Sequence, residues 1–116
     1  MKIITWNING FRACWEKGLD EYALLSDADI IAFQETKVNQ PILISDFEGF
    51  GYNAAWNCAE RNGYSGTLCL FKENPVSIGR KIGVGKLETE GRIITLEYHG
   101  FYFVNVNVSV FRVQFI

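Results

Sequence analysis

The order of apolar and polar positions predicts a β-α-β unit at the start of the chain. Residues 2–6 and 29–34 are short, almost continuously apolar runs, a pattern typical of buried strands. Between them, Leu19–Ser26 carries apolar residues three and four positions apart, which predicts an amphipathic helix. After Pro41, the apolar residues 42–44 predict part of another short helix.

From residue 52 onward the pattern changes to short strands separated by turn residues, of which Pro75 and Gly100 are the clearest. Residues 93–96 and 101–104 are apolar at nearly every position, so we expect strands buried on both faces. The predicted strands are residues 52–58, 67–71, 76–81, 92–98 and 101–108. Because no repeat or linker interrupts this series, we predict one domain.

Composition limits the classes of partner. The 116 residues are 48% apolar and 15% aromatic, which is ample for a packed core. The net charge is −2, so no global positive field favours binding to nucleic acid. Any affinity for phosphate must therefore come from local cations.

The cysteines and the apolar segments indicate a compartment. Cys14, Cys58 and Cys69 are odd in number and lack C-x-x-C spacing, which argues against a disulfide framework and a zinc site. No apolar stretch approaches the roughly 18 residues of a membrane span, and the first residues do not resemble a signal peptide. We therefore expect a soluble protein of the reducing cytoplasm with no membrane partner.

Polar side chains follow the first two predicted strands. Asn7 and Asn9 follow the first, and Glu35 follows the second. Because α/β sheets form ligand sites at the carboxyl ends of their strands, these three residues can converge. One carboxylate and two amide oxygens suit a hard cation such as Mg²⁺. The alternatives are an exposed strand-end carboxylate and two asparagines that form turns.

Four short segments together resemble the exonuclease III type of apurinic/apyrimidinic endonuclease, within the endonuclease/exonuclease/phosphatase superfamily. They are residues 6–10, 34–37, 63–66 and 90–92. The resemblance implies half of a four-layer α/β sandwich, with one mostly antiparallel sheet and helices on one face. It divides the chain into residues 1–106, the N-terminal half of a nuclease-like domain, and 107–116, a divergent tail.

The resemblance also implies roles for individual residues. It makes Asn7 and Glu35 catalytic, and it makes Glu35 and Asn9 ligands of Mg²⁺, with Mn²⁺ as an alternative. It places five further residues along the backbone of double-stranded DNA: Arg12, Lys37, Arg61, Tyr64 and Arg92. The bland alternatives are solubilising surface cations and a tyrosine packed in a glycine-rich corner.

The match ends where the family continues into a Tyr-x-Pro-Asn segment, because Asn107, Ser109 and Val110 occupy those three positions here. The family's water-activating Asp and its Asp-His pair have no counterpart in this sequence. His99, the one histidine, lies in a predicted hairpin turn and matches no catalytic position. We therefore expect a sequence of the Mg²⁺-dependent DNA-repair nuclease type, with abasic-site endonuclease and 3′–5′ exodeoxyribonuclease activity in the family, that is inactive alone.

Two other interpretations stay open. The chain could be a non-catalytic, truncated remnant that self-associates, or another phosphodiesterase or phosphatase of the superfamily. The segments 11–13 and 63–66 favour the DNA-directed branch. Half a sandwich would leave one sheet face uncovered, which predicts a homodimer through the face formed by residues 67–71 and 92–96.

Overall fold

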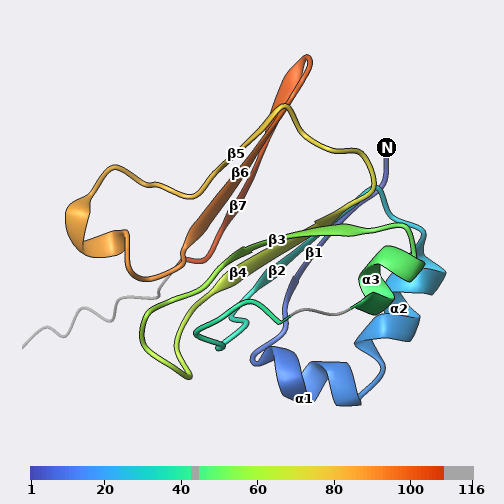
Figure 1. The fold of residues 1–116 in the computed structure, drawn as a ribbon, viewed down its shortest axis with the longest axis horizontal. Coiled ribbons are helices and arrows are strands. Elements are labelled where there is room, and N and C mark those ends of the chain that lie inside the picture. Colours follow the sequence, from blue (N-terminus) through green and yellow to red (C-terminus); the bar gives the residue numbers. More distant parts are fainter. Residues whose placement is uncertain (43–44, 109–116) are drawn as a thin grey trace, which may run out of the picture.

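A computed structural model describes residues 1–42 and 45–108 of the chain. Its seven strands form two sheets that pack face to face (Figure 1). We call the sheet with strand order β1-β2-β4-β3 sheet A and the sheet with order β5-β6-β7 sheet B. The strands are β1 Ile3–Asn7, β2 Ile30–Gln34, β3 Asn53–Asn57, β4 Thr67–Phe71, β5 Ser77–Gly79, β6 Ile93–Tyr98 and β7 Phe101–Val106.

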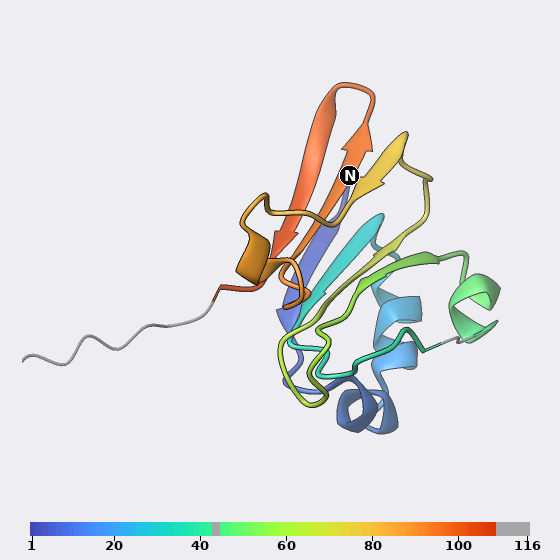
Figure 2. The same cartoon turned by 60° about the vertical axis from the view of Figure 1, so that its left-hand side comes forward.

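Three α-helices cover the face of sheet A that points away from sheet B, so the molecule has three layers (Figure 2). They are α1 Phe11–Glu16, α2 Leu19–Ser26 and α3 Ser45–Gly49, and a 3₁₀ turn spans Gly85–Leu87. The helix predicted at residues 19–26 is confirmed with its bounds. The one expected at 42–44 falls mainly outside the described residues, and the observed helix begins at Ser45. None of the described helices is long and apolar enough to cross a membrane.

The core has two parts, one on each face of sheet A. Phe11, Leu19 and Ala23 pack from the helices against alternate side chains of β2 and β4. The intervening side chains of β2 and β4 pack against Ile94 and Leu96 of sheet B. Because both of its faces are covered, every residue of β4 is buried. The sequences of β2 and β4 are apolar at nearly every position because helices cover one face of these strands and sheet B covers the other.

The predicted class, an α/β sandwich, is confirmed, but the expectation of one sheet is wrong. The chain leaves sheet A after Phe71, and beyond Pro75 strand β5 pairs with β6 instead of with sheet A. Burial alternates along β6: Ile94, Leu96 and Tyr98 are buried, whereas the residues between them are half-buried. The expectation that residues 93–96 and 101–104 are buried on both faces is therefore wrong, because β6 is packed on one face only and β7 fully buries only Asn105.

The expected location of the uncovered face is also wrong. Residues 67–71 are buried, as are Ile94 and Leu96, because these strands face each other between the two sheets. The large exposed apolar side chains of the strands lie mostly on β1 and β7 instead, at Ile3, Trp6, Phe101, Tyr102, Val104 and Val106.

Candidate functional site

The carboxyl ends of β1 and β2 meet at one end of sheet A, because the two strands are parallel neighbours. The loops that follow are joined through their backbones. The Ile8 N–H donates to the carbonyl of Gln34 at 3.1 Å, and the Gly10 N–H donates to the carbonyl of Glu35 at 2.8 Å. Asn7, Asn9 and Glu35 therefore lie on adjoining loops, as the sheet-edge argument predicts.

Hydrogen bonds orient the oxygen atoms of these loops. The Asn9 N–H donates to Oδ1 of Asn7 at 3.1 Å. The ammonium of Lys37 donates to Oδ1 of Asn9, so that oxygen already faces a cation. Glu35 is half-buried, and its carboxylate has no side-chain partner within the described residues. Each amide oxygen keeps a second lone pair, so one carboxylate and two neutral oxygens are available, a donor set that fits a hard cation.

The glycine-rich loop 63–66 closes against the same place. The Lys37 N–H donates to the carbonyl of Ser65 at 2.8 Å, and the Gly63 N–H donates to the carbonyl of Lys37 at 3.2 Å. Gly66 adopts φ +91°, and a Cβ there would lie 2.2 Å from Oγ1 of buried Thr36. Only glycine allows this approach of the two loops without a shift.

Several residues at this end of the sheet have strained backbone conformations. Asn9, Glu35, Lys37 and Ser65 all have φ between 48° and 58°, a left-handed region that residues other than glycine seldom occupy. Such strain is typical of sites that the surrounding structure holds in place for function. Asn-Gly marks Asn9 in the sequence, but no local signal marks Glu35 or Lys37.

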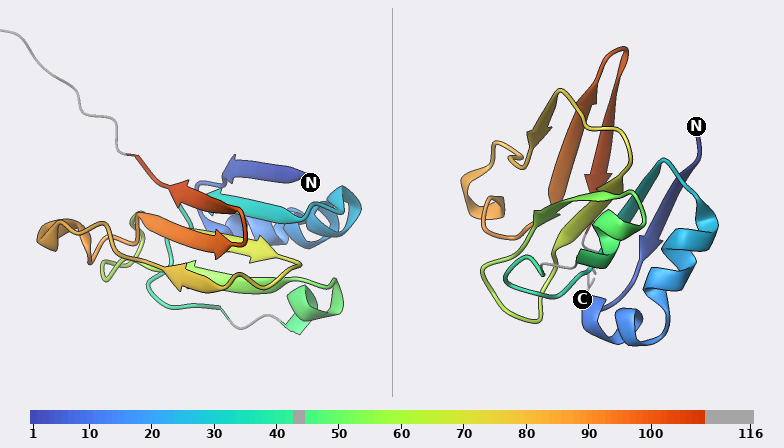
Figure 3. Two further views of the ribbon diagram at one scale, coloured as in Figure 1. Left: turned by 90° about the horizontal axis from the view of Figure 1, so that it is seen from above. Right: turned by 45° about the vertical axis from the view of Figure 1, so that its right-hand side comes forward.

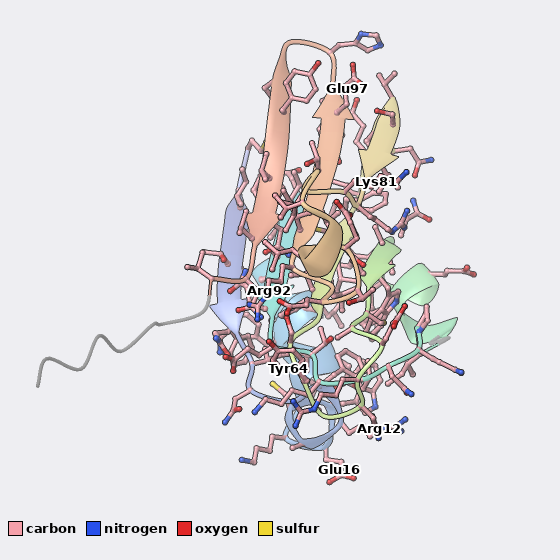
Figure 4. All side chains as sticks on the ribbon, turned by 90° about the vertical axis from the view of Figure 1, so that its left-hand side faces the viewer. Arg12, Glu16, Tyr64, Lys81, Arg92 and Glu97 are labelled. Atoms are coloured by element: carbon pink, nitrogen blue, oxygen red, sulfur yellow. The ribbon has the colours of Figure 1, made fainter. Side chains whose placement is uncertain are left out.

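Arg92 and Tyr64 form a second group beside these loops (Figure 4). Arg92 is only 8% exposed. Its guanidinium donates to the Tyr64 hydroxyl at 2.7 Å, to the Asn107 carbonyl at 3.2 Å and to the Glu90 carboxylate. Burial acts to lower the Arg92 pKa, but Glu90 and Tyr64 outweigh it and raise the pKa. Arg92 is thus a charged internal tie, and its role as a direct DNA contact stays a prediction.

The other predicted cations are more accessible. Arg61 is exposed, and its guanidinium carbon lies 5.4 Å from the centre of the Tyr64 ring, compared with 5.5 Å for that of Arg92. Arg12 is exposed on α1, near Glu16 in Figure 4. The structure therefore gathers Lys37, Tyr64, Arg61 and Arg92 on connected loops, whereas Arg12 extends from the neighbouring helix.

Sequence reasoning missed the structural role of Asn107. This residue is 7% exposed, and its Nδ2 donates to Oγ of Ser65 at 2.9 Å. Its N–H donates to the carbonyl of Arg92 at 2.8 Å. It thereby ties the end of β7 to the glycine-rich loop. The alternation of valine and asparagine over residues 104–108 was the available signal, because alternate residues of an extended strand share one face.

The remaining candidate groups lie elsewhere. His99 is exposed in the turn between β6 and β7, as expected for a hairpin. Cys14, Cys58 and Cys69 are free thiols, and burial raises the pKa of each. Across residues 1–42 and 45–108, no cluster of three or more His, Cys, Asp or Glu side chains could hold a metal ion.

Two sheets packed face to face, with helices on one outer face and polar side chains at the carboxyl ends of parallel strands, define a protein of the α/β sandwich class. The chain belongs to the endonuclease/exonuclease/phosphatase family, whose pattern matches residues 4–112. It is 41% identical over 108 residues to a DNA-(apurinic or apyrimidinic site) endonuclease of Dictyostelium discoideum, covering 93% of this chain and 30% of that protein. It is also 41% identical to an exodeoxyribonuclease of Bacillus subtilis, covering 91% of this chain and 42% of that protein.

Solved structures agree with the fold. An AP endonuclease from Archaeoglobus fulgidus matches with a TM-score of 0.80 and 25% identity over 93% of this chain. A 3′ phosphatase from Neisseria, bound to a product DNA hairpin, matches with a TM-score of 0.76 and 22% identity over 91% of this chain. The chain covers 41% and 40% of these two proteins, and less than half the length of the sequence relatives above.

Proposed function

We propose that this chain carries the metal-binding and backbone-binding part of a DNA-repair nuclease that acts at abasic sites or 3′ ends of double-stranded DNA. The observation that carries the proposal is the convergence of Asn7, Asn9 and Glu35 on adjoining, strained loops. The names of the two relatives at 41% identity support the same substrate class. A phosphatase of the wider family is the second candidate, but the sequence relatives above favour DNA.

In this proposal Glu35 and Asn9 hold a divalent cation, Mg²⁺ or Mn²⁺, and Asn7 orients Asn9 and the reacting phosphate. Such a cation would polarise a phosphoryl oxygen. With one carboxylate, affinity should be weak. Lys37 must move off Oδ1 of Asn9 or share that oxygen with the cation, so we expect cation and Lys37 to compete there.

The DNA contacts in this proposal are contacts to the backbone. Arg61 and Tyr64 offer a guanidinium and an aromatic ring on the loop 61–66, and Lys37 and Arg12 add positive charge near the proposed metal site. Arg92 donates to the Tyr64 hydroxyl and so positions the ring, and its direct contact with phosphate remains part of this proposal. Contacts of this kind position a duplex without reading its sequence.

We also propose that the 116-residue chain does not cleave DNA by itself. Among the described residues no three His, Cys, Asp or Glu side chains gather at one place, and the one histidine, His99, lies exposed in the β6–β7 turn. A missing general base and missing phosphate clamps each remove roughly 10²-fold or more of rate. The alternative, a remnant with no catalytic role at all, predicts that even the metal site is lost.

Metal binding tests the proposal directly. Paramagnetic relaxation of water protons by Mn²⁺ should reveal weak binding that Glu35→Gln abolishes and that the exposed control Glu16→Gln leaves unchanged. Binding that survives Glu35→Gln would contradict the assignment of the ligand. A duplex with an abasic-site analogue should stay intact with Mg²⁺, and Glu35-dependent incision would overturn the claim of inactivity.

A further inference from the structure

Thr36 carries a buried hydroxyl for which the fold supplies no partner. The residue is wholly buried, and its Oγ1 makes no hydrogen bond within residues 1–42 and 45–108. A buried polar atom without a partner is rare in native proteins and calls for a cause, because an apolar side chain of the same shape would avoid its cost. Thr36 lies between Glu35 and Lys37, the two residues of the proposed site that follow β2.

The backbone of Thr36 joins the two segments that enclose it. Its N–H donates to the carbonyl of Gly66 at 3.2 Å, and its carbonyl accepts from the N–H of Phe11 at 2.8 Å. Phe11 begins α1, and Gly66 immediately precedes β4. The segment after β2, helix α1 and the loop before β4 lie at the same end of sheet A (Figure 1 and Figure 3). Thr36 therefore connects the segment after β2 to both of its neighbours.

The hydroxyl of Thr36 packs directly against Gly66. A Cβ at Gly66 would lie 2.2 Å from Oγ1 of Thr36 and 3.5 Å from the backbone nitrogen of Lys37. This approach needs a glycine on one side of the contact. On the other side it needs a group no larger than a hydroxyl, because a methyl group requires more room than an oxygen atom. The contact therefore explains a threonine at a position where valine would leave no polar atom unpaired.

The same contact supports the conformations of Glu35 and Lys37. Both have φ 58°, a value that persists only where the surrounding structure holds it. The Glu35 carbonyl accepts from the Gly10 N–H at 2.8 Å, and the Lys37 N–H donates to the Ser65 carbonyl at 2.8 Å. Displacing loop 63–66 would lengthen the second bond and let Glu35 and Lys37 relax toward negative φ. Their carboxylate and ammonium groups would then point in other directions.

We propose that Thr36 is a positioning residue for the proposed metal site. By letting loop 63–66 pack closely on residues 35–37, its hydroxyl keeps the Glu35 carboxylate and the Lys37 ammonium in place, and it contacts neither cation nor phosphate. The role rests on the proposed function for its consequence, but the packing that carries it involves protein atoms alone. Valine keeps the shape of threonine and replaces Oγ1 by a methyl group, so it should disturb the site. Serine keeps the oxygen and should not.

Hydrogen exchange of the metal-free chain tests the packing itself. In Thr36→Val, the amides of Lys37 and Gly63, which donate between the two loops, should lose protection, whereas those of β4 should not. Thr36→Ser should keep the protection of the parent. Thr95→Val is the matched control, because it makes the same chemical change at a half-buried position of sheet B. Gly66→Ala should expose the same amides as Thr36→Val, and the double variant should add little, because both substitutions break one contact.

The affinity for Mn²⁺ separates positioning from folding. Glu35-dependent binding should weaken about tenfold in Thr36→Val, as is typical when a group outside the ligand shell is changed. It should stay at the parent value in Thr36→Ser and Thr95→Val. The midpoint of urea unfolding should stay near that of the parent in Thr36→Val, because the hydroxyl has no hydrogen bond to lose.

Three results would overturn the proposal. They are unchanged exchange and affinity in Thr36→Val, an equal loss in Thr36→Ser, and a loss of Mn²⁺ affinity accompanied by a matching fall in the urea midpoint. A parent chain that binds no Mn²⁺ would instead contradict the proposed function. The exchange of the Lys37 and Gly63 amides would still decide whether Thr36 holds the loops together.

Discussion

The edge strands on the two long sides of the sandwich are all uncharged, but the two sides are closed to different degrees. On the side of β3 and β5, Nδ2 of Asn57 donates to the carbonyls of Ile93 at 2.8 Å and Arg80 at 3.2 Å. The Arg80 Nε donates to the carbonyl of Trp56 at 2.7 Å. The segment between β5 and β6 thus crosses from one sheet to the other and ties them together.

On the side of β1 and β7, the described residues connect the two sheets only by side-chain hydrogen bonds between them. Nε2 of Gln34 donates to Oδ1 of Asn105 at 2.8 Å and to Oγ1 of Thr5 at 3.0 Å. No described segment crosses outside these strands. The comparison teaches that a sheet edge is closed by the polar groups of a connecting segment, because backbone donors and acceptors at the edge need partners.

The largest expected difference between the two regions is in core packing. Leu96→Ala should lower the free energy of unfolding by about 2–5 kcal/mol, because Leu96 is fully buried between the sheets. Ile3→Ala, on the open side, should cost about 1 kcal/mol or less at concentrations where the chain is monomeric. Urea titrations measure both values. An equal cost for the two variants would mean that the β1 side is already covered in the monomer.

A smaller effect should come from the tie on the closed side. Asn57→Ala removes the donor to the Ile93 and Arg80 carbonyls and should destabilise the fold by about 1–3 kcal/mol. Asn53→Ala, in the same strand, loses only an exposed bond to Asn74 and should stay within about 0.5 kcal/mol of the parent. Hydrogen exchange should show faster opening of residues 80–92 in Asn57→Ala alone. Unchanged exchange there would show that Asn57 does not close this side.

A further effect, seen only at alkaline pH, should appear in the layer between the sheets. Burial raises the pKa of Cys69 from about 9 to about 12 and that of Tyr98 from about 10 to about 12. Both groups hold their protons more tightly when folded, so this stabilisation is complete below about pH 9 and is lost as the pH rises toward 12.

Chemical denaturation between neutral pH and about pH 11 measures this loss. Cys69→Ala together with Tyr98→Phe should flatten the decline in the free energy of unfolding relative to the parent. Tyr102→Phe is the control, because Tyr102 is 68% exposed on the outer face of sheet B. A decline that the double variant leaves unchanged would show that these two groups do not determine alkaline stability.

Local pattern was sufficient to predict most of the elements. Apolar spacing located Leu19–Ser26, and the observed β4 has the bounds predicted for residues 67–71. Helix α1 was not predicted, because its six residues are too few for a periodic signal, and it is held by packing of Phe11 beneath sheet A. The proximity of the polar residues that follow β1 and β2 could be predicted from the sequence, because the carboxyl ends of parallel neighbouring strands lie at the same edge of the sheet.

The sequence by itself determined the approximate positions of the strands, the burial of β2 and the family. Only the tertiary structure decided that the strands divide into two sheets, that Arg92 is internal, and that the open surface lies along β1 and β7. The apolar pattern locates a strand but does not determine how many of its faces are covered or which element covers them, as β4 and β6 show. A guanidinium is likewise equally suited to DNA phosphate or to Glu90 and the Tyr64 hydroxyl, and only the packing of loops far apart in sequence determines which it meets.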